Sequence, residues 1–205
     1  MNRRNPDVLF YGENPQIFLY NGEEVTAAVS YWQAQYTPYG EGQALLIKLD
    51  AANADRTDHP QMAIYTDNVP MANYLNQAFN RHFDGWEEDW VTLKIQQARF
   101  SLERDSRHYQ RVTCFADAFR VQMEWQDIRT HELRTYDDFN QGKMGLQGNL
   151  HMDLSHVICL CGAGSIVING IPASGEVMSF TQDDRFRSSA FIAQAEVWTQ
   201  SQAGS

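Results

Sequence analysis

Cysteine is scarce in this sequence, with 3 among 205 residues. The number is odd, and Cys159 and Cys161 lie in the apolar run Val157–Cys161, where a free thiol behaves as a small hydrophobic group. No further ligands at a suitable spacing accompany them, which argues against a zinc site. We therefore expect buried, reduced cysteines and a reducing, cytoplasmic location.

Long apolar stretches are also missing. No segment approaches the roughly 20 apolar residues that a membrane-spanning helix needs. The basic residues Arg3 and Arg4 are not followed by the apolar core of a signal peptide. We expect a soluble protein with no membrane partner.

Positive charge is in short supply. Lysine and arginine number 16 against 26 aspartate and glutamate residues, which gives a formal net charge of -10. A nucleic-acid partner is not expected, because such binding draws much of its affinity from a basic surface. The arginines are spread along the predicted strands, a pattern that favours cross-strand ion pairs over an anion-binding patch.

The motifs of the common enzyme classes are absent as well. The glycine-rich Gly162–Gly164 lacks both the following helix and the Lys-Ser/Thr pair of a phosphate loop, and is typical of a hairpin turn. There is no Gly-x-Ser-x-Gly and no His-Glu-x-x-His. We predict no cofactor.

Strand and turn patterns fill most of the chain. About ten β-type segments are joined by short turns, of which Asn21-Gly22 predicts a type I′ hairpin, and the polar stretch Asp50–Pro60 predicts a surface loop. Closure of so many strands removes exposed sheet edges. We predict one domain over residues 1–205, an all-β antiparallel barrel of calycin or lipocalin-like type with one inserted helix and a frayed tail at 200–205. A two-sheet sandwich is the alternative.

The inserted helix is predicted over about residues 69–83. Asp67 or Asn68 can cap its first turn, Pro70 supplies a helical φ where no donor is needed, and apolar residues from Met71 onwards recur at helical spacing. With one apolar stripe, the helix is expected to pack on the barrel or to close one of its ends.

Acidic and aromatic residues follow this helix. His82 with Asp84 or Glu87 could form a general acid–base pair at the mouth of a ligand site. The alternative is a structural role, in which Arg81 and His82 offset the helix dipole and the acidic residues form a solvent-exposed turn.

Large aromatic side chains are the candidates for the wall of a ligand pocket. The five we select are Phe79, Trp86, Trp90, Tyr31 and Trp125. His151 and Asp153 would share one face of a strand, as in part of a two-histidine, one-carboxylate metal site, but the flanking apolar residues favour turning both to solvent. We predict no metal and keep this pair as the weak alternative.

Three functions remain open. The first is binding of a small apolar molecule in the barrel, suggested by the aromatic content. The second is a cofactor-free isomerase, cyclase or hydratase that uses the acid–base pair, so the sequence leaves open whether the protein is an enzyme. The third is a structural role in which Trp86 and Trp90 form the interface of a homo-oligomer.

Overall fold

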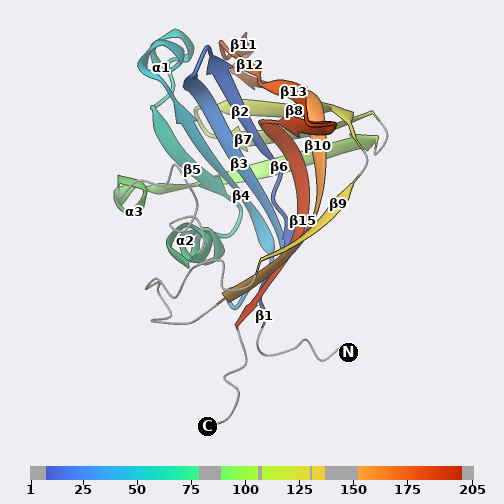
Figure 1. The fold of residues 1–205 in the computed structure, drawn as a ribbon. Coiled ribbons are helices and arrows are strands. Elements are labelled where there is room, and N and C mark those ends of the chain that lie inside the picture. Colours follow the sequence, from blue (N-terminus) through green and yellow to red (C-terminus); the bar gives the residue numbers. More distant parts are fainter. Residues whose placement is uncertain (1–7, 79–88, 106–107, 130, 137–151, 200–205) are drawn as a thin grey trace.

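Nine strands of this chain close into a mixed β-barrel, in the order β10-β8-β7-β6-β5-β4-β3-β1-β15, with β15 pairing back onto β10. The structure is a computed structural model that describes residues 8–78, 89–105, 108–129, 131–136 and 152–199. Figure 1 shows the barrel with its helices outside the strands. The barrel strands are β1 (Val8–Glu13), β3 (Glu24–Tyr36), β4 (Gly42–Leu49), β5 (Met62–Thr66), β6 (Ile95–Asp105), β7 (Tyr109–Ala116), β8 (Arg120–Ile128), β10 (Met152–Ile168) and β15 (Ala190–Thr199).

Shorter strands extend this framework. They are β2 (Gln16–Asn21), β9 (Glu132–Tyr136), β11 (Ile171–Pro172), β12 (Glu176–Val177), β13 (Ser179–Gln182) and β14 (Arg185–Ser188). Among the described strands, β13 and β14 pair only with each other and form a separate hairpin, while β9 pairs with β10. The predicted barrel is therefore confirmed in its closure, and the sandwich is not favoured. The finer lipocalin-like assignment is not confirmed.

One pair of barrel strands contradicts the antiparallel prediction. β5 and β6 run parallel, with Ile64 opposite Ile95 and Thr66 opposite Gln97. The physical reason is the connection between them, which contains α2 (Val69–Ala78) and α3 (Asp89–Thr92). A crossover of this length returns the chain to the end at which β5 began, so that the next strand runs in the same direction.

Alternation along the strands separates two apolar layers. Inward residues such as Val29, Leu45, Ile47, Val112 and Met123 form one buried cluster inside the barrel. The residues of β3 and β4 at the alternate positions face outwards and form a second buried cluster with α2. Both faces of these strands are thus covered.

Helix α2 begins where the sequence predicts. Asn68 accepts a hydrogen bond from Met71 N at 3.2 Å, which is the expected cap. Met71 and Leu75 are fully buried against Leu46 and Ile64 on the outer face of the sheet. The helix therefore packs on the wall of the barrel and does not close its end. The predicted extension to residue 83 lies outside the described residues.

The prediction of a single helix with a surface loop at Asp50–Pro60 is wrong, because α1 (Ala51–Thr57) lies there. Asp50 caps it by accepting a hydrogen bond from Asn53 N at 2.7 Å. Ala54 joins the interior cluster, so this short helix, and not α2, covers one end of the barrel (Figure 1). With seven residues, it has no apolar periodicity that could have revealed it.

Two turn predictions also change. Gly162–Gly164 lies inside β10, where a Cβ on Gly162 would come within 2.1 Å of Asp127 Oδ2, so the glycine allows close approach and not a turn. A hairpin does form there, but Asn21 pairs with Glu24, so its loop is Gly22 and Glu23. Because φ is positive at Gly22 but not at Glu23, the predicted type I′ turn, which needs a positive φ at both central residues, is wrong.

The structure confirms the expected free thiols and, at Arg111, the expected cross-strand ion pairs. Cys114 and Cys161 are buried and Cys159 is half-buried, all as free thiols. Arg111 bridges its cross-strand neighbours Glu103 and Glu124 at 3.1 and 2.7 Å. In the described part of the chain, no helix has the length and apolarity that crossing a membrane requires.

Candidate functional site

Most residues of the predicted acid–base, metal and aromatic sites fall outside the described residues. These are His82, Asp84, Glu87, Phe79, Trp86 and His151. The acid–base pair stays a prediction. Asp153 is half-buried on β10, and no group of three possible metal ligands occurs among the described residues.

The predicted aromatic set is divided between two layers. Trp90 lies in α3, is 6% exposed, and belongs to the outer cluster; its carbonyl accepts a hydrogen bond from Asn76 Nδ2 at 2.9 Å. Tyr31 and Trp125 instead lie inside the barrel and are fully buried. The structure thus brings these two together and separates Trp90 from them.

Tyr31 and Trp125 are each fixed by a hydrogen bond. The Tyr31 hydroxyl donates to Gln43 Oε1, and its ring lies 5.9 Å from that of Phe100. Trp125 Nε1 donates to the carbonyl of Gln16 at 2.9 Å. Both side chains are therefore preorganised as aromatic walls of the interior.

A row of three inward-facing side chains crosses the interior next to them. Trp125 on β8 lies opposite Gln110 on β7, which in turn lies opposite Arg104 on β6. Gln110 is 1% exposed, and within the described chain its Nε2 has no hydrogen-bond partner. A buried donor without a partner costs about 1–3 kcal/mol, so it needs an explanation.

The wall beside this row is closed by side chains. β6 pairs with β5 only at Ile95–Gln97, and from Ala98 onwards its described backbone pairs with β7 alone. Beyond this point the side chain of Arg104 on β6 reaches Glu13 on β1 and donates from two nitrogens to its carboxylate, at 3.1 and 2.5 Å. Its side chain is 36% exposed. This stretch of wall can open without separating any pair of strands.

Burial governs the protonation of the interior groups. It is the largest cause that raises the pKa of Tyr31, with Glu13 and Asp67 adding to it, so the phenol remains a hydrogen-bond donor. Burial also raises the pKa of the Cys114 thiol to about 12. A thiol held in this state is a poor nucleophile.

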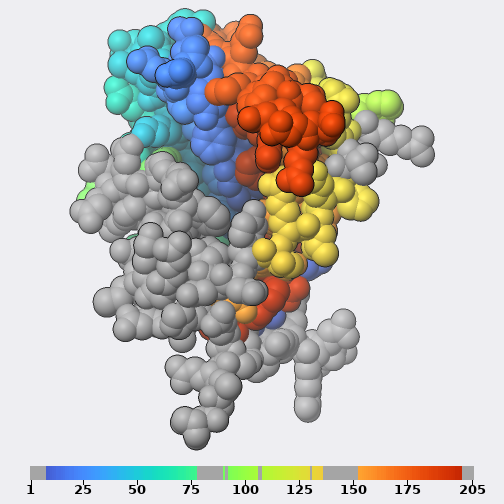
Figure 2. Space-filling view, in the orientation of Figure 1, coloured from blue at the N-terminus to red at the C-terminus, as the bar shows by residue number. Residues whose placement is uncertain are grey.

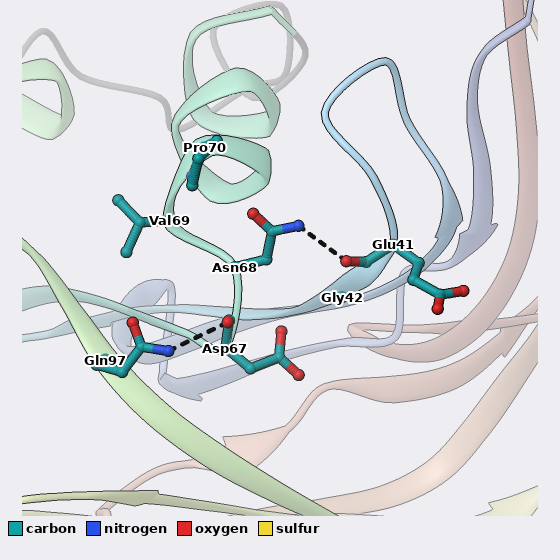
Figure 3. Close-up of a pocket in the computed structure, with 7 residues that line it drawn as sticks. All are labelled: Glu41, Gly42, Asp67, Asn68, Val69, Pro70 and Gln97. Carbon is teal, nitrogen blue, oxygen red and sulfur yellow. Dashed lines mark hydrogen bonds between the residues drawn. The ribbon is translucent and has the colours of Figure 1, made fainter.

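A pocket of about 620 Å³ lies outside the barrel where α2 begins (Figure 3). Gln43 links it to the interior, because Gln43 binds the Tyr31 hydroxyl and donates through its backbone N to Asp67 Oδ1 at 2.6 Å. The amide of Asn68 donates to the carbonyls of Tyr39 and Glu41. Since these donors already hold the β3–β4 hairpin against α2, we interpret the pocket as a structural joint.

A buried histidine that the sequence analysis did not select lies at the α1 end. His59 Nδ1 donates to the Pro60 carbonyl at 2.6 Å, and its Nε2 accepts from the Tyr65 hydroxyl at 2.9 Å. The Phe119 ring packs against it at 4.6 Å. His59 is 4% exposed and both ring nitrogens are occupied, so we assign it a packing role.

Comparison with known proteins identifies no relative. No family model matches the chain, and neither a curated protein nor a solved structure is significantly similar to it.

Proposed function

We propose that the protein binds a small, largely apolar molecule that carries a hydrogen-bond acceptor, inside the barrel at the Arg104 side. The observation that carries the proposal is the buried Gln110 Nε2, which has no partner among the described residues. An acceptor atom of a ligand at this point would remove the cost of burying the amide.

The surroundings of Gln110 agree with such a ligand. Trp125 is its cross-strand neighbour, and Tyr31 and Phe100 add two further aromatic rings to the interior. Pockets for small molecules are mostly apolar and contain a few polar groups that fix orientation. Opening of the Arg104–Glu13 pair provides an entrance, and the side chains behind it rearrange to make room.

A library of apolar carbonyl, ester and carboxylate compounds, screened by thermal shift, tests the proposal. Hits should raise the Tm of the wild-type protein, because a ligand that binds only the folded state stabilises it. The variant Gln110→Leu should unfold at a higher temperature than the wild type when no ligand is present, since it removes the unsatisfied donor. The same variant should lose the shift with the hits.

The matched control is Gln122→Leu, which changes a glutamine on the outer face of β8. It should keep the ligand-induced shift. The proposal fails if no compound shifts the wild-type Tm, or if Gln110→Leu and Gln122→Leu respond alike to every hit.

The two other functions inferred from the sequence receive no added support. The pair of His82 with Asp84 or Glu87 lies outside the described residues, as does Trp86 of the predicted interface. Trp90, the other residue of that interface, is buried in the outer cluster. Catalysis and homo-oligomer formation therefore stay predictions.

A further inference from the structure

Four arginines from two distant parts of the chain gather around Phe186 on the outside of the barrel. Arg129 follows β8 and Arg134 lies on β9, while Arg185 and Arg187 belong to β14. Figure 2 shows the orange-red surface of the β13–β14 hairpin next to the yellow surface of β9. Along the sequence these arginines are scattered, and the pairing of β9 with β10 brings them to the same place.

A pocket of about 460 Å³ lies between these segments. It is lined by Glu132, Arg134, Arg185, Phe186 and Arg187. Three guanidinium groups thus face one carboxylate in a protein whose formal net charge is -10. The volume is within the range of about 300–1,000 Å³ that small-molecule sites occupy.

The charges of this group are only partly compensated. Arg134 pairs with Glu132 at 3.0 Å, and Arg129 pairs with Asp127 at 2.6 Å. Neither Arg185 nor Arg187 forms an ion pair with any carboxylate in the described ranges. Since guanidinium groups bind oxyanions through two parallel hydrogen bonds, both arginines retain the capacity to hold one.

The base of the pocket is held in place. Phe186 is half-buried and packs against the small cluster of Ile158 and Leu160. The guanidinium carbon of Arg129 lies 4.9 Å from the centre of its ring, in cation–π geometry. Arg185 and Arg187 are two positions apart on β14 and so lie on one face of this strand, while the Phe186 side chain between them lies on the other face, against the barrel. The lining of the pocket therefore combines one aromatic residue with a pair of cations.

We propose that this arginine pocket binds a small organic anion, a phosphate monoester whose apolar part packs near Phe186. A dianionic phosphate matches the two uncompensated guanidinium groups better than a single carboxylate does. The site is separate from the barrel interior and does not depend on the function proposed for it. Variants of Gln110 should leave anion binding unchanged, so failure of one proposal does not affect the other.

Isothermal titration at low salt with phenyl phosphate, benzoate and inorganic phosphate tests this site. Phenyl phosphate should bind the wild-type protein more tightly than the other two probes. The double variant Arg185→Gln, Arg187→Gln should weaken its binding by about tenfold or more, which corresponds to about 1.4 kcal/mol or more, since both guanidinium groups that can hold the oxyanion are removed. Arg134→Gln, a single change, is the second test should the double variant not fold.

The chain offers a closely matched control. Arg99 and Arg120 flank Phe115 on the outer face of β6, β7 and β8, with the guanidinium carbon of Arg120 5.6 Å from the centre of the Phe115 ring. The double variant Arg99→Gln, Arg120→Gln removes the same charge from another arginine–aromatic group. It should retain the wild-type affinity to within about twofold.

Three outcomes overturn the proposal. The first is the absence of measurable phenyl phosphate binding to the wild-type protein. The second is an equal loss of affinity in both double variants, which would indicate general electrostatic attraction. The third is preferential, Arg185-dependent binding of an acidic peptide such as oligoglutamate, which would assign the surface to a protein partner.

Discussion

Asn53 of α1 and Ser174 of the β11–β12 connection, 121 positions apart, share three hydrogen bonds. Asn53 Oδ1 accepts from Ser174 N at 2.7 Å and from Ser174 Oγ at 2.9 Å, and Asn53 Nδ2 donates to Ser174 O at 3.3 Å. The same Nδ2 donates to Thr26 O at 3.1 Å. A single fully buried amide therefore fixes the helix that covers this end of the barrel.

The change Asn53→Ala should lower the free energy of unfolding by about 3 kcal/mol, because it leaves buried backbone groups of Ser174 and Thr26 without partners. Urea unfolding followed by circular dichroism measures this. Asn73→Ala, on the exposed side of α2, is the control and should cost no more than about 0.5 kcal/mol. Similar losses in the two variants would contradict the role assigned to Asn53.

Gly42→Ala should destabilise the contact between the β3–β4 hairpin and α2. An added Cβ would lie 2.7 Å from Asp67 Oδ1, 2.8 Å from Asn68 Cβ and 3.2 Å from Met71 Sδ. Crowding of this kind costs about 1–3 kcal/mol, and we expect the upper half of that range because Asp67 is also held by Gln43 N.

The comparison for Gly42 is Gly22→Ala in the β2–β3 hairpin. Gly22 has a φ of 64° and no atom within 4 Å of an added Cβ, so only backbone strain of about 1 kcal/mol is expected. Denaturant unfolding of both variants should rank Gly42→Ala as the less stable. The opposite order would show that the hairpin and the helix can move apart at little cost.

The parts of this fold that could be predicted from the sequence have a local chemical signal. Asn68 caps α2 because its amide reaches Met71 N, and the alternation of β8 places Val121, Met123 and Trp125 inside the barrel. Local signals of this kind depend on residues close in sequence. From such signals the start of α2 and most of the strands could be predicted. The number of strands then indicated that they close into a barrel.

The features that were missed depend on distant neighbours. Gly162 is needed in β10 because Asp127 of β8 lies against it. α1 is held by Ser174, and the arginine pocket forms only when β9 and β14 lie together. Gln110 is an exception, since it shares the parity of Val112 and Cys114 on β7, and that pattern already indicates a polar group facing inwards.

The stability of the protein should fall as the pH drops below about 6.5, in part because of His59. Burial is the largest cause that lowers the pKa of His59 from 6.5, opposed by its bond to the Pro60 carbonyl. Protonation would also place a second N–H against the Tyr65 hydroxyl, which now donates to Nε2. Between the pKa of His59 in the folded chain and its pKa in the unfolded chain, the unfolded chain binds more protons than the folded one. The contribution of His59 to stability therefore increases with pH over this interval and is fully present above about 6.5.

The variant His59→Gln should reduce this slope by up to about 1.4 kcal/mol per pH unit, the value for one proton. Some slope remains, because burial and the nearby Arg134 also lower the pKa of His156. Urea unfolding of the wild type and of His59→Gln at pH 7.5, 6.5 and 5.5 measures the effect. If the profiles of His59→Gln and the wild type are parallel over this range, His59 does not titrate as its burial requires.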